Sequence, residues 1–202
     1  MKTRKLSQTA PALCVLAVSI FFSQSVVRAQ KADTPPGLDT NAAKAAAASE
    51  PESAPTIDRV GFQKDYSTTF QVLRTFTRNE EPKIITVYAN AAAASVTDTA
   101  QLPYPYGSVL VFEYANSLKD SAGNPMPDAQ GGVRKGEVDH ADVMRREKGF
   151  GEAYGKHRTG EWEYAGYRPD GSYTTPPAKS ASCATCHVKA GSTKDFVFRG
   201  KF

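Results

Sequence analysis

A short motif, Cys183-Ala184-Thr185-Cys186-His187, lies near the C-terminal end of this chain of 202 residues. Cys-x-x-Cys-His is the pattern that attaches c-type haem. The two thiols lie about one helical turn apart, so each can form a thioether to one vinyl group of the same porphyrin, and the histidine that follows can supply an axial nitrogen to the iron. We therefore predict that Cys183 and Cys186 hold one haem c covalently and that His187 ligates its iron.

Two other uses of paired cysteines are weaker interpretations of the motif. A thioredoxin-like Cys-x-x-Cys follows a strand in a βαβ unit, whereas residues 173–182, which precede this motif, resemble a loop. A structural zinc site needs a full set of converging ligands, and only His140 and His157 are available to complete one. Haem attachment is therefore favoured, with a zinc site and a redox dithiol as the alternatives.

The N-terminus has the parts of a secretory signal peptide. Lys2, Arg4 and Lys5 form a positively charged region, residues 12–22 form an apolar stretch, and residues 27–29 offer the small side chains that a signal peptidase reads. We predict that residues 1–29 are a signal peptide and that the protein is exported to a bacterial periplasm or a similar space. The alternative is an uncleaved N-terminal anchor, although the apolar stretch is short for a membrane span.

The charge of the mature chain depends on this cleavage. Four of the 25 Lys and Arg residues lie within residues 1–29, which contain no acidic residue, so 21 cationic residues remain against 21 Asp and Glu. No positive surplus is left to favour nucleic acid or an anionic membrane as a partner. Cleavage also removes Cys14, so that Cys183 and Cys186 remain and no disulfide pair is to spare.

The rest of the chain divides into a linker and one domain. Residues 30–56 are rich in Ala and Pro and almost free of large apolar side chains, which is typical of a flexible linker. Residues 57–202 are long enough for one sizeable core, and their β-branched and aromatic runs predict a mainly β fold. Strands are expected at residues 70–76 (with a helix over 66–76 as the alternative), 83–88, 108–114, 162–168 and 195–199, short helices at 91–94 and at the motif, a turn at 169–171, and a long loop at 118–132.

This β-rich pattern excludes two familiar classes of haem-c protein. Class I cytochromes c carry the motif near the N-terminus and a Met ligand well downstream, but no Met follows His187 here. The four-helix cytochromes c′ carry the motif near the C-terminus, as this chain does, yet they are built from long amphipathic helices. Proline, glycine and strand patterns precede the motif here instead.

The order of several short segments resembles that of the cytochrome P460 family, which includes the β-sheet cytochromes c′ (cytochrome c′-β). The segments are Val87-Tyr88-Ala89-Asn90, residues 104–111, Gly160-Glu161-Trp162, Pro169-Asp170-Gly171, and the haem motif followed by Asp195-Phe196-Val197-Phe198. The resemblance covers most of residues 57–202. It implies a homodimer of mostly antiparallel β structure with one haem c, attached through Cys183 and Cys186, and with His187 as the proximal ligand.

The same resemblance implies a small nitrogen-oxide ligand or substrate. Members that oxidise hydroxylamine carry a covalent bond from a lysine to the porphyrin edge and pass electrons to a partner cytochrome, whereas the cytochromes c′-β lack that bond and bind nitric oxide. We expect such a lysine on or near residues 109–114. Phe112 and Glu113 stand there, and Lys119 is the nearest lysine. The sequence therefore leaves both activities open.

A filled sixth coordination position would instead make the protein a plain electron-transfer cytochrome. Candidate sixth ligands are Met126, Met144, His140, His157 or a lysine, and the best of them is Met126, which lies in an Asn-Pro-Met-Pro loop. The two histidines lie among charged residues and are expected at the surface.

An open site would depend on the residues that line it. Six aromatic residues could form an apolar cap, which favours neutral diatomic molecules because a charged ligand would lose its hydration without a compensating donor. They are Phe62, Phe70, Phe76, Tyr88, Phe112 and Tyr114. Hydroxylamine oxidation also needs a proton acceptor, and Glu113 and Asp120 are the candidates for that role.

Overall fold

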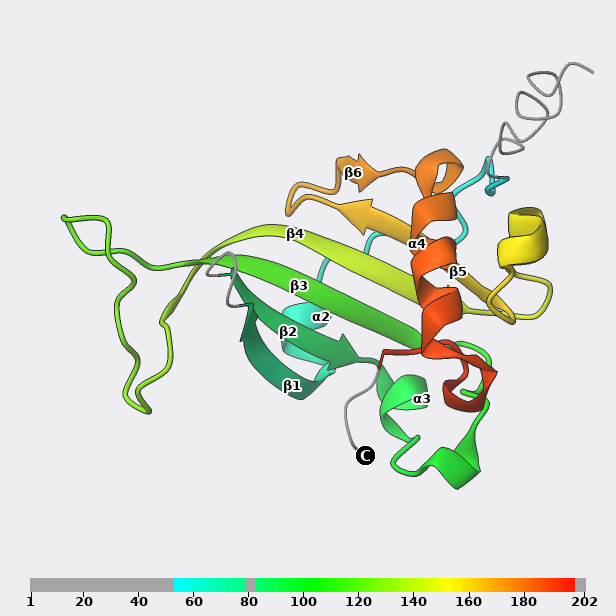
Figure 1. Cartoon of the computed structure of the whole chain (residues 1–202), viewed down its shortest axis with the longest axis horizontal. Helices are drawn as coiled ribbons and strands as arrows, with labels where there is room; N and C mark the ends of the chain where they lie inside the picture. Colours follow the sequence, from blue (N-terminus) through cyan, green and yellow to red (C-terminus); the bar gives the residue numbers. More distant parts are fainter. Residues whose placement is uncertain (1–52, 79–82, 199–202) are drawn as a thin grey trace, which may run out of the picture. The chain divides into compact units, whose positions relative to one another are not determined.

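In residues 53–78 and 83–198, which the computed structural model describes, six strands form one antiparallel sheet (Figure 1). Each strand pairs with the next one along the chain. The strands are β1 (Gln71–Arg78), β2 (Lys83–Ala89), β3 (Val109–Ser117), β4 (Lys135–Arg146), β5 (Trp162–Tyr167) and β6 (Tyr173–Thr175). The predicted mainly β, antiparallel fold is confirmed.

Helices are short in the described part of the chain. They are α2 (Tyr66–Thr69), α3 (Ala91–Ala94), α4 (Ala181–His187) and the 3-10 helices η1 (Thr99–Gln101), η2 (Glu152–His157), η3 (Pro177–Lys179), η4 (Val188–Ala190) and η5 (Ser192–Lys194). The side-chain oxygen of Asn90 starts α3 by accepting the backbone N–H of Ala93 at 3.0 Å, and it also accepts the N–H of Val109 at 3.0 Å. One side chain therefore ties the end of β2 to the beginning of β3.

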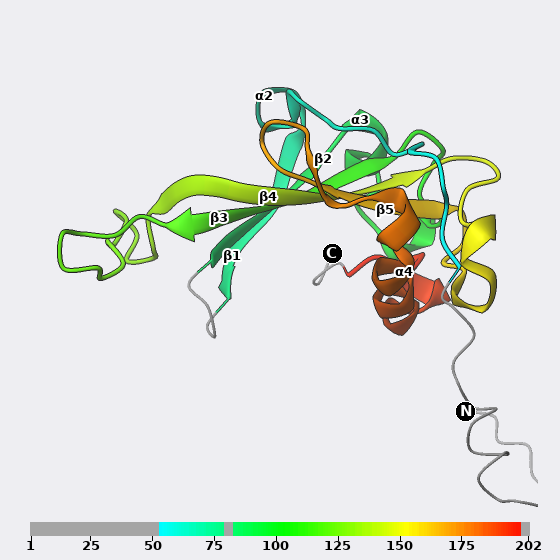
Figure 2. The same cartoon turned by 90° about the horizontal axis from the view of Figure 1, so that it is seen from above.

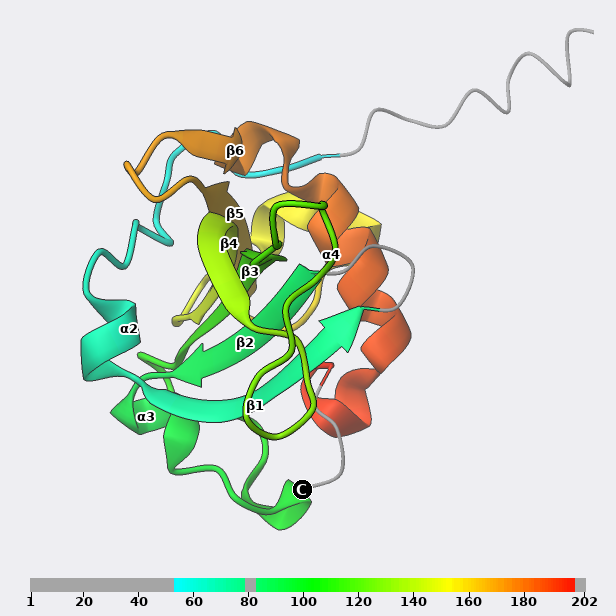
Figure 3. The same ribbon diagram turned by 90° about the vertical axis from the view of Figure 1, so that its left-hand side faces the viewer.

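Side chains alternate between the two faces of the sheet, because successive residues of a strand point to opposite sides. One face carries a core cluster that includes Leu110 and Met144, and α4 packs into this cluster through Ala184. The opposite face carries a second cluster that includes Val111 and Val143. Figures 2 and 3 show α4 on one side of the sheet and α2 on the other. Each face is thus covered by a different segment of the chain.

Two charged side chains fix the segment before α2 to the second face. The carboxylate of Asp58 accepts hydrogen bonds from the hydroxyls of Tyr167 (2.7 Å) and Tyr173 (2.8 Å). Arg59 forms an ion pair with Glu163, whose side chain is 1% exposed. Because a buried carboxylate needs a partner, this ion pair holds the segment against the sheet.

Most of the predicted elements are present. The strands expected at 70–76, 83–88, 108–114 and 162–168 correspond to β1, β2, β3 and β5, and both predicted short helices form. The alternative helix over 66–76 is limited to α2. The strand expected at 195–199 is wrong over its described residues, because Asp195 and Phe196 adopt left-handed φ angles of 47° and 59° that no strand can contain. β4 was not predicted, because its many charged residues conceal its alternation.

The connection between β3 and β4 is a projecting arm, where the sequence predicted a loop at 118–132 (Figure 1). Two isolated bridges, Lys119 with Pro125 and Pro127 with Val133, hold its limbs together. Figures 1 and 2 both place the arm at the end of the sheet away from α4.

The predicted signal peptide (1–29) and residues 30–52 of the predicted linker lie outside the described residues, so both stay predictions. At the end of that linker, Pro55 is buried and Ala54 packs against the core cluster beneath α4. Within the described residues, no helix is both long enough and apolar enough to cross a membrane.

Replacing Asp58 by Asn is expected to lower the free energy of unfolding of the holoprotein at pH 7 by about 1.5–2 kcal/mol, at the low end of the range for hydrogen bonds to a charged group, because Asp58 is only half-buried. Burial raises the pKa of Asp58, but hydrogen bonds from the backbone of Gly61 and from Tyr167 and Tyr173 outweigh it, and the net pKa lies below its usual value. A lowered folded-state pKa gives stability that is present above the unfolded-state pKa and is lost as the pH falls through the folded-state pKa.

The difference between wild type and Asp58→Asn should therefore shrink below about pH 4. Urea unfolding at pH 7 and at pH 3 measures it. Asp170→Asn is the matched control, because Asp170 is an exposed turn carboxylate whose hydrogen bonds go to the neighbouring Ser172. An Asp58→Asn effect of the same size at both pH values would contradict the assignment.

Candidate functional site

The predicted haem motif forms α4, a helix of seven residues. The backbone N–H groups of Cys183 and Ala184 donate to the carbonyl of Ser180 at 3.0 and 3.2 Å, which starts the helix. Ala181 and Ala184 are three residues apart and so lie on one side of the helix; they are 6% and 0% exposed. His187 is three residues beyond Ala184 and so continues this side of the helix, and together with Cys183 and Cys186 it borders a pocket.

A row of buried hydroxyl groups fixes the start of α4 to β5. The Ser180 hydroxyl donates to the carbonyl of Pro177 (2.7 Å), and because it has a single proton it accepts from the Tyr154 hydroxyl (2.8 Å). The Tyr154 oxygen in turn accepts the backbone N–H of Tyr164 in β5 (3.3 Å), and the Tyr164 hydroxyl pairs with that of Thr159 (2.7 Å). Each hydroxyl therefore has a protein partner in place of water.

One hydrogen bond and two aromatic rings orient the imidazole of His187. Its Nδ1–H donates to the carbonyl of Phe196 at 2.7 Å. Because a carbonyl only accepts, Nδ1 carries the proton and Nε2 keeps a lone pair that can bind a metal. The rings of Tyr164 and Phe198 lie 4.7 and 5.2 Å from the imidazole, centroid to centroid. Burial lowers the pKa of His187 against the opposing effect of the bond to Phe196, so the neutral form that ligates metals prevails at pH 7.

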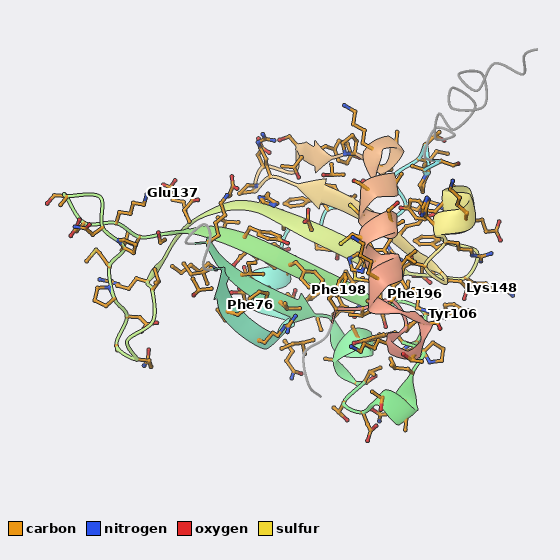
Figure 4. All side chains as sticks on the ribbon, viewed as in Figure 1. Phe76, Tyr106, Glu137, Lys148, Phe196 and Phe198 are labelled. Carbon is orange, nitrogen blue, oxygen red and sulfur yellow. The ribbon has the colours of Figure 1, made fainter. Side chains whose placement is uncertain are left out.

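The pocket has a volume of about 400 Å³, which is within the range of roughly 300–1,000 Å³ for small-molecule sites. Most of its lining side chains are aromatic or aliphatic. They come from β1 (Arg74, Phe76), β2 (Ile85), β3 (Phe112, Tyr114), β4 (Asp142, Val143, Met144), β5 (Tyr164, Ala165), α4 (Cys183, Cys186, His187) and the segment after it (Phe198). Figure 4 labels Phe76 beside β1 and Phe198 beside α4.

Two charged side chains lie among these lining residues. Burial raises the pKa of Asp142, although attraction to His140 acts in the opposite direction. Arg74 donates from Nη2 to the carbonyl of Phe198 (2.9 Å), and its guanidinium lies 4.8 Å from the centroid of the Phe76 ring. A carboxylate in apolar surroundings can exchange a proton with a small polar molecule, and a guanidinium can donate hydrogen bonds to that molecule.

The profile of the family described as Cytochrome P460 matches residues 63–199. The chain belongs to the cytochrome P460 family. The predicted resemblance is thereby confirmed, and membership implies that the protein binds haem. The matched residues contain all six strands and α4. A comparison with curated protein sequences gave no match.

The pocket suits the haem that membership of the cytochrome P460 family implies. Two thiols and an imidazole with a free Nε2 lone pair border it, and much of the remaining lining is as apolar as a porphyrin face. In residues 53–78 and 83–198 no group of three or more His, Cys, Asp and Glu side chains could hold a metal ion, so the zinc alternative has no support there. The antiparallel sheet also argues against a thioredoxin-like βαβ unit.

Several residues that the sequence suggested for this P460-type site lie in the pocket, and others do not. The pocket contains Phe76, Phe112, Tyr114 and Met144 together with the three motif residues. The opposite face of the sheet contains Phe62, Phe70 and Tyr88, and the arm contains Lys119, Asp120 and Met126.

The expectation that Glu113 or Asp120 is the proton acceptor of the site is wrong. Glu113 alternates with Phe112 along β3, so its side chain lies on the face opposite α4, where it is 2% exposed. There it accepts a hydrogen bond from the Tyr66 hydroxyl (2.7 Å) and pairs with Nζ of Lys135 (2.5 Å). Asp120 accepts backbone hydrogen bonds within a turn of the exposed arm.

The two histidines expected at the surface do not line the pocket. His140 lies near it, because its ring stacks on that of Tyr114 with 4.4 Å between centroids. Its Nδ1 lies 3.0 Å from the carboxylate of Asp139, and its side chain is 25% exposed. His157 is half-buried in η2.

Sequence reasoning missed Asp142, Arg74, Tyr164 and Phe198 as lining residues of this cytochrome P460 pocket. The signal for Asp142 was the alternation of β4, which places it on the same face as Met144, two residues further along. An acidic residue among strand residues that face the core indicates a functional role. Asp142 could be recognised in this way only once residues 135–146 were known to form a strand.

Tyr154→Phe is expected to destabilise the holoprotein by about 1–3 kcal/mol, because it removes the partner of a buried hydroxyl and leaves the Tyr164 N–H without an acceptor. Tyr106→Phe is the matched control: Tyr106 is 50% exposed and its hydroxyl donates to Glu161 (2.6 Å), so its loss should cost less than about 0.5 kcal/mol. Urea unfolding measures both variants. Equal losses would show that the row of hydroxyls does not hold α4.

Proposed function

We propose that this member of the cytochrome P460 family is an exported c-type cytochrome that binds nitric oxide. Cys183 and Cys186 hold one haem through thioethers, and His187 ligates its iron. The observation that carries the proposal is the meeting of two thiols, an oriented imidazole and an aromatic wall in one cavity of about 400 Å³.

The two thiols suit attachment better than dithiol redox chemistry. Cys183 is partly buried and Cys186 is exposed, and no disulfide joins them. Burial, with a further contribution from the charge of Asp142, raises the pKa of Cys183 to about 11. Its thiol is therefore protonated at pH 7, whereas redox-active cysteines have lowered pKa values.

Aromatic side chains favour a small uncharged ligand. Haem iron, when bound, supplies a coordination position and one-electron redox chemistry. Phe76, Phe112 and Phe198 line the pocket and give it an apolar surface. A charged ligand would lose its hydration there at a cost of several kcal/mol unless a donor compensated for it. Nitric oxide is neutral and avoids that cost.

The position of lysines supports nitric oxide binding over hydroxylamine oxidation. Among the described residues no lysine lines the pocket, and Phe112 occupies the place where the resemblance led us to expect the cross-linking lysine. Lys119, the nearest in sequence, lies in the arm and borders a separate surface hollow with Lys83 and Ser117. The partner for a lysine–porphyrin bond is thus lacking at this position.

Asp142 favours a second candidate function, the oxidation of hydroxylamine. That oxidation releases protons as well as electrons, so it needs a proton acceptor near the substrate. Asp142 provides a carboxylate in the pocket, and Arg74 provides a donor for a polar ligand. In this alternative the electrons pass to a partner cytochrome.

A six-coordinate electron-transfer cytochrome, the third possibility, would use Met144 rather than Met126. Met126 lies in the arm, whereas Met144 borders the pocket. However, Met144 is 1% exposed and packs in the core cluster beneath α4. This packing supports a structural role for its thioether.

Export and assembly belong to the same proposal. Residues 1–29 support a periplasmic location, and the family resemblance supports a homodimer. The balanced charge of residues 30–202 argues against nucleic acid as a partner, and a redox partner cytochrome belongs to the alternative of hydroxylamine oxidation.

Absorption spectra of the purified holoprotein test the proposed function. We expect a high-spin spectrum in the ferric and dithionite-reduced forms, and a new spectrum on addition of nitric oxide. Met144→Leu should leave all three unchanged, as should Met126→Leu, the matched control in the arm. In a denaturing gel the haem should stay with the chain, and the double variant of Cys183 and Cys186 to Ala should lose it.

A low-spin spectrum that Met144→Leu converts to high-spin would contradict this proposal in favour of electron transfer. A high-spin protein that does not bind nitric oxide would contradict it as well.

The variant Asp142→Asn distinguishes hydroxylamine oxidation, the second candidate function, from nitric oxide binding. If the protein oxidises hydroxylamine, the variant should turn it over at least about 100-fold more slowly. Burial raises the pKa of Asp142, so wild-type turnover should rise as the pH increases through that raised pKa, and the variant should lack this rise. A raised folded-state pKa also means that ionised Asp142 costs stability above it, so the variant should be no less stable than wild type at pH 7.

Glu113→Gln is the control for Asp142→Asn, because Glu113 is a buried carboxylate on the opposite face of the neighbouring strand. It should lower stability and leave turnover unchanged. Steady-state assays with an electron-accepting dye, from pH 4 to 8, decide the matter. A wild type without turnover rejects the second candidate and leaves nitric oxide binding.

A further inference from the structure

Asp195 and Phe196, which lie just before the last two described residues, have an unfavourable backbone conformation. Their φ angles are 47° and 59°, and they are the only non-glycine residues with positive φ among those described. Side chains crowd the backbone in this region, so a left-handed pair is kept only where surrounding contacts hold it. Such residues gather at functional sites.

This left-handed turn aims one carbonyl group at the axial ligand of the proposed haem. The N–H of Phe196 donates to the carbonyl of Gly191 at 2.9 Å. On its other side, the carbonyl of Phe196 accepts the Nδ1–H of His187 at 2.7 Å. The orientation of the imidazole therefore depends on the backbone conformation of Phe196, which directs this carbonyl.

The carboxylate of Asp195 is the anchor of the turn. It is 6% exposed, and its Oδ2 accepts the backbone N–H of Tyr104 at 2.9 Å. The same oxygen lies 3.5 Å from Nε of Arg146, at the end of β4. Arg146 also donates from Nη1 to the carbonyl of Tyr104 at 2.5 Å. Asp195 is thus fixed to two elements that are distant in sequence.

The carboxylate forms no hydrogen bond to His187 itself, although it is only one residue from the carbonyl that does. A carboxylate bonded directly to a metal-binding imidazole draws its proton strongly, whereas a peptide carbonyl draws it more weakly. The hydrogen-bond acceptor of the imidazole is therefore the uncharged carbonyl of Phe196. The charged side chain of Asp195 holds that carbonyl in place through its contacts with Tyr104 and Arg146.

We propose that Asp195 is a positioning residue for the axial ligand: by fixing the Phe196 carbonyl it sets the hydrogen bond of His187 and thereby the electron donation of the imidazole to the iron. The inference rests on the proposed role of His187 as ligand. A full hydrogen bond increases the basicity of the imidazole, which strengthens the iron–nitrogen bond and stabilises the ferric state.

Two variants of Asp195 test this. Glycine accepts the left-handed conformation but has no side chain to anchor it. Asparagine tolerates that conformation and keeps an oxygen for the Tyr104 N–H, but it loses the charge that faces Arg146. In resonance Raman spectra of the ferrous holoprotein, Asp195→Gly should lower the iron–histidine stretching frequency, and redox titration should show a higher reduction potential. Asp195→Asn should lie between Asp195→Gly and wild type.

Glu163→Gln is the matched control. Glu163 is also a buried carboxylate paired with an arginine, Arg59, but it lies on the opposite face of the sheet. The variant Glu163→Gln should be less stable in urea than wild type. Its iron–histidine stretching frequency and its reduction potential should equal the wild-type values.

Folded Asp195 variants with the wild-type frequency and potential would overturn the proposal. If Asp195→Gly does not fold, Asp195→Asn and Arg146→Lys, which moves the charge that holds the carboxylate, decide it by the same two measurements. A wild-type ferrous spectrum without an iron–histidine band would contradict the role of His187 as ligand, and so the proposed function, rather than the role of Asp195 alone.

Discussion

The contact between Ala184 and the sheet determines the position of every chemical group in the motif. Ala184 lies between the two cysteines and is 0% exposed, packed in the cluster that contains Leu110 and Met144. A methyl group allows the helix backbone to approach the strands closely. A larger side chain would push α4 away from the sheet, since close-packed cores accommodate extra volume only by shifting their neighbours. Both thiols and the imidazole would then move together.

The two faces of the sheet use charge in different ways. On the face away from α4, the buried carboxylates are paired: Glu113 with Lys135, and Glu163 with Arg59. These pairs join segments that are distant in sequence and so serve the fold. On the face under α4, Asp142 borders the pocket and has no ion pair among the described residues. A carboxylate kept without a partner in an apolar pocket costs stability, which is the usual sign of a group retained for function.

Local sequence patterns predicted the parts of this structure that depend on local forces. The β-branched run at 83–88 and the motif helix could be recognised because their propensities agree with their final environments. β4 could not, because its apolar residues, at positions 138, 141, 143 and 144, do not keep the period of two that identifies a strand. The left-handed turn at Asp195 and Phe196 depends on contacts with Tyr104 and Arg146, which no local pattern contains.

The site shows the same division. The three motif residues were identified from their spacing, but the choice between Glu113 and Asp142 required knowing which face of the sheet lies under α4. Alternation alone says that Phe112 and Glu113 point in opposite directions; it does not say which of them meets the haem motif. A shift of one residue in that assignment exchanges a pocket-lining side chain for one on the far face.

The order of the strands keeps the pairing of the sheet local in sequence. Every ladder of the sheet joins strands that are consecutive in the chain, so its contacts are local and its hairpins can form quickly without waiting for distant segments. α4 follows all six strands in the chain and packs on a face that those strands form. Ala184 and the Tyr154 hydroxyl attach α4 to that face. The sheet can therefore form from local hairpins before the segment that carries the two thiols packs on it.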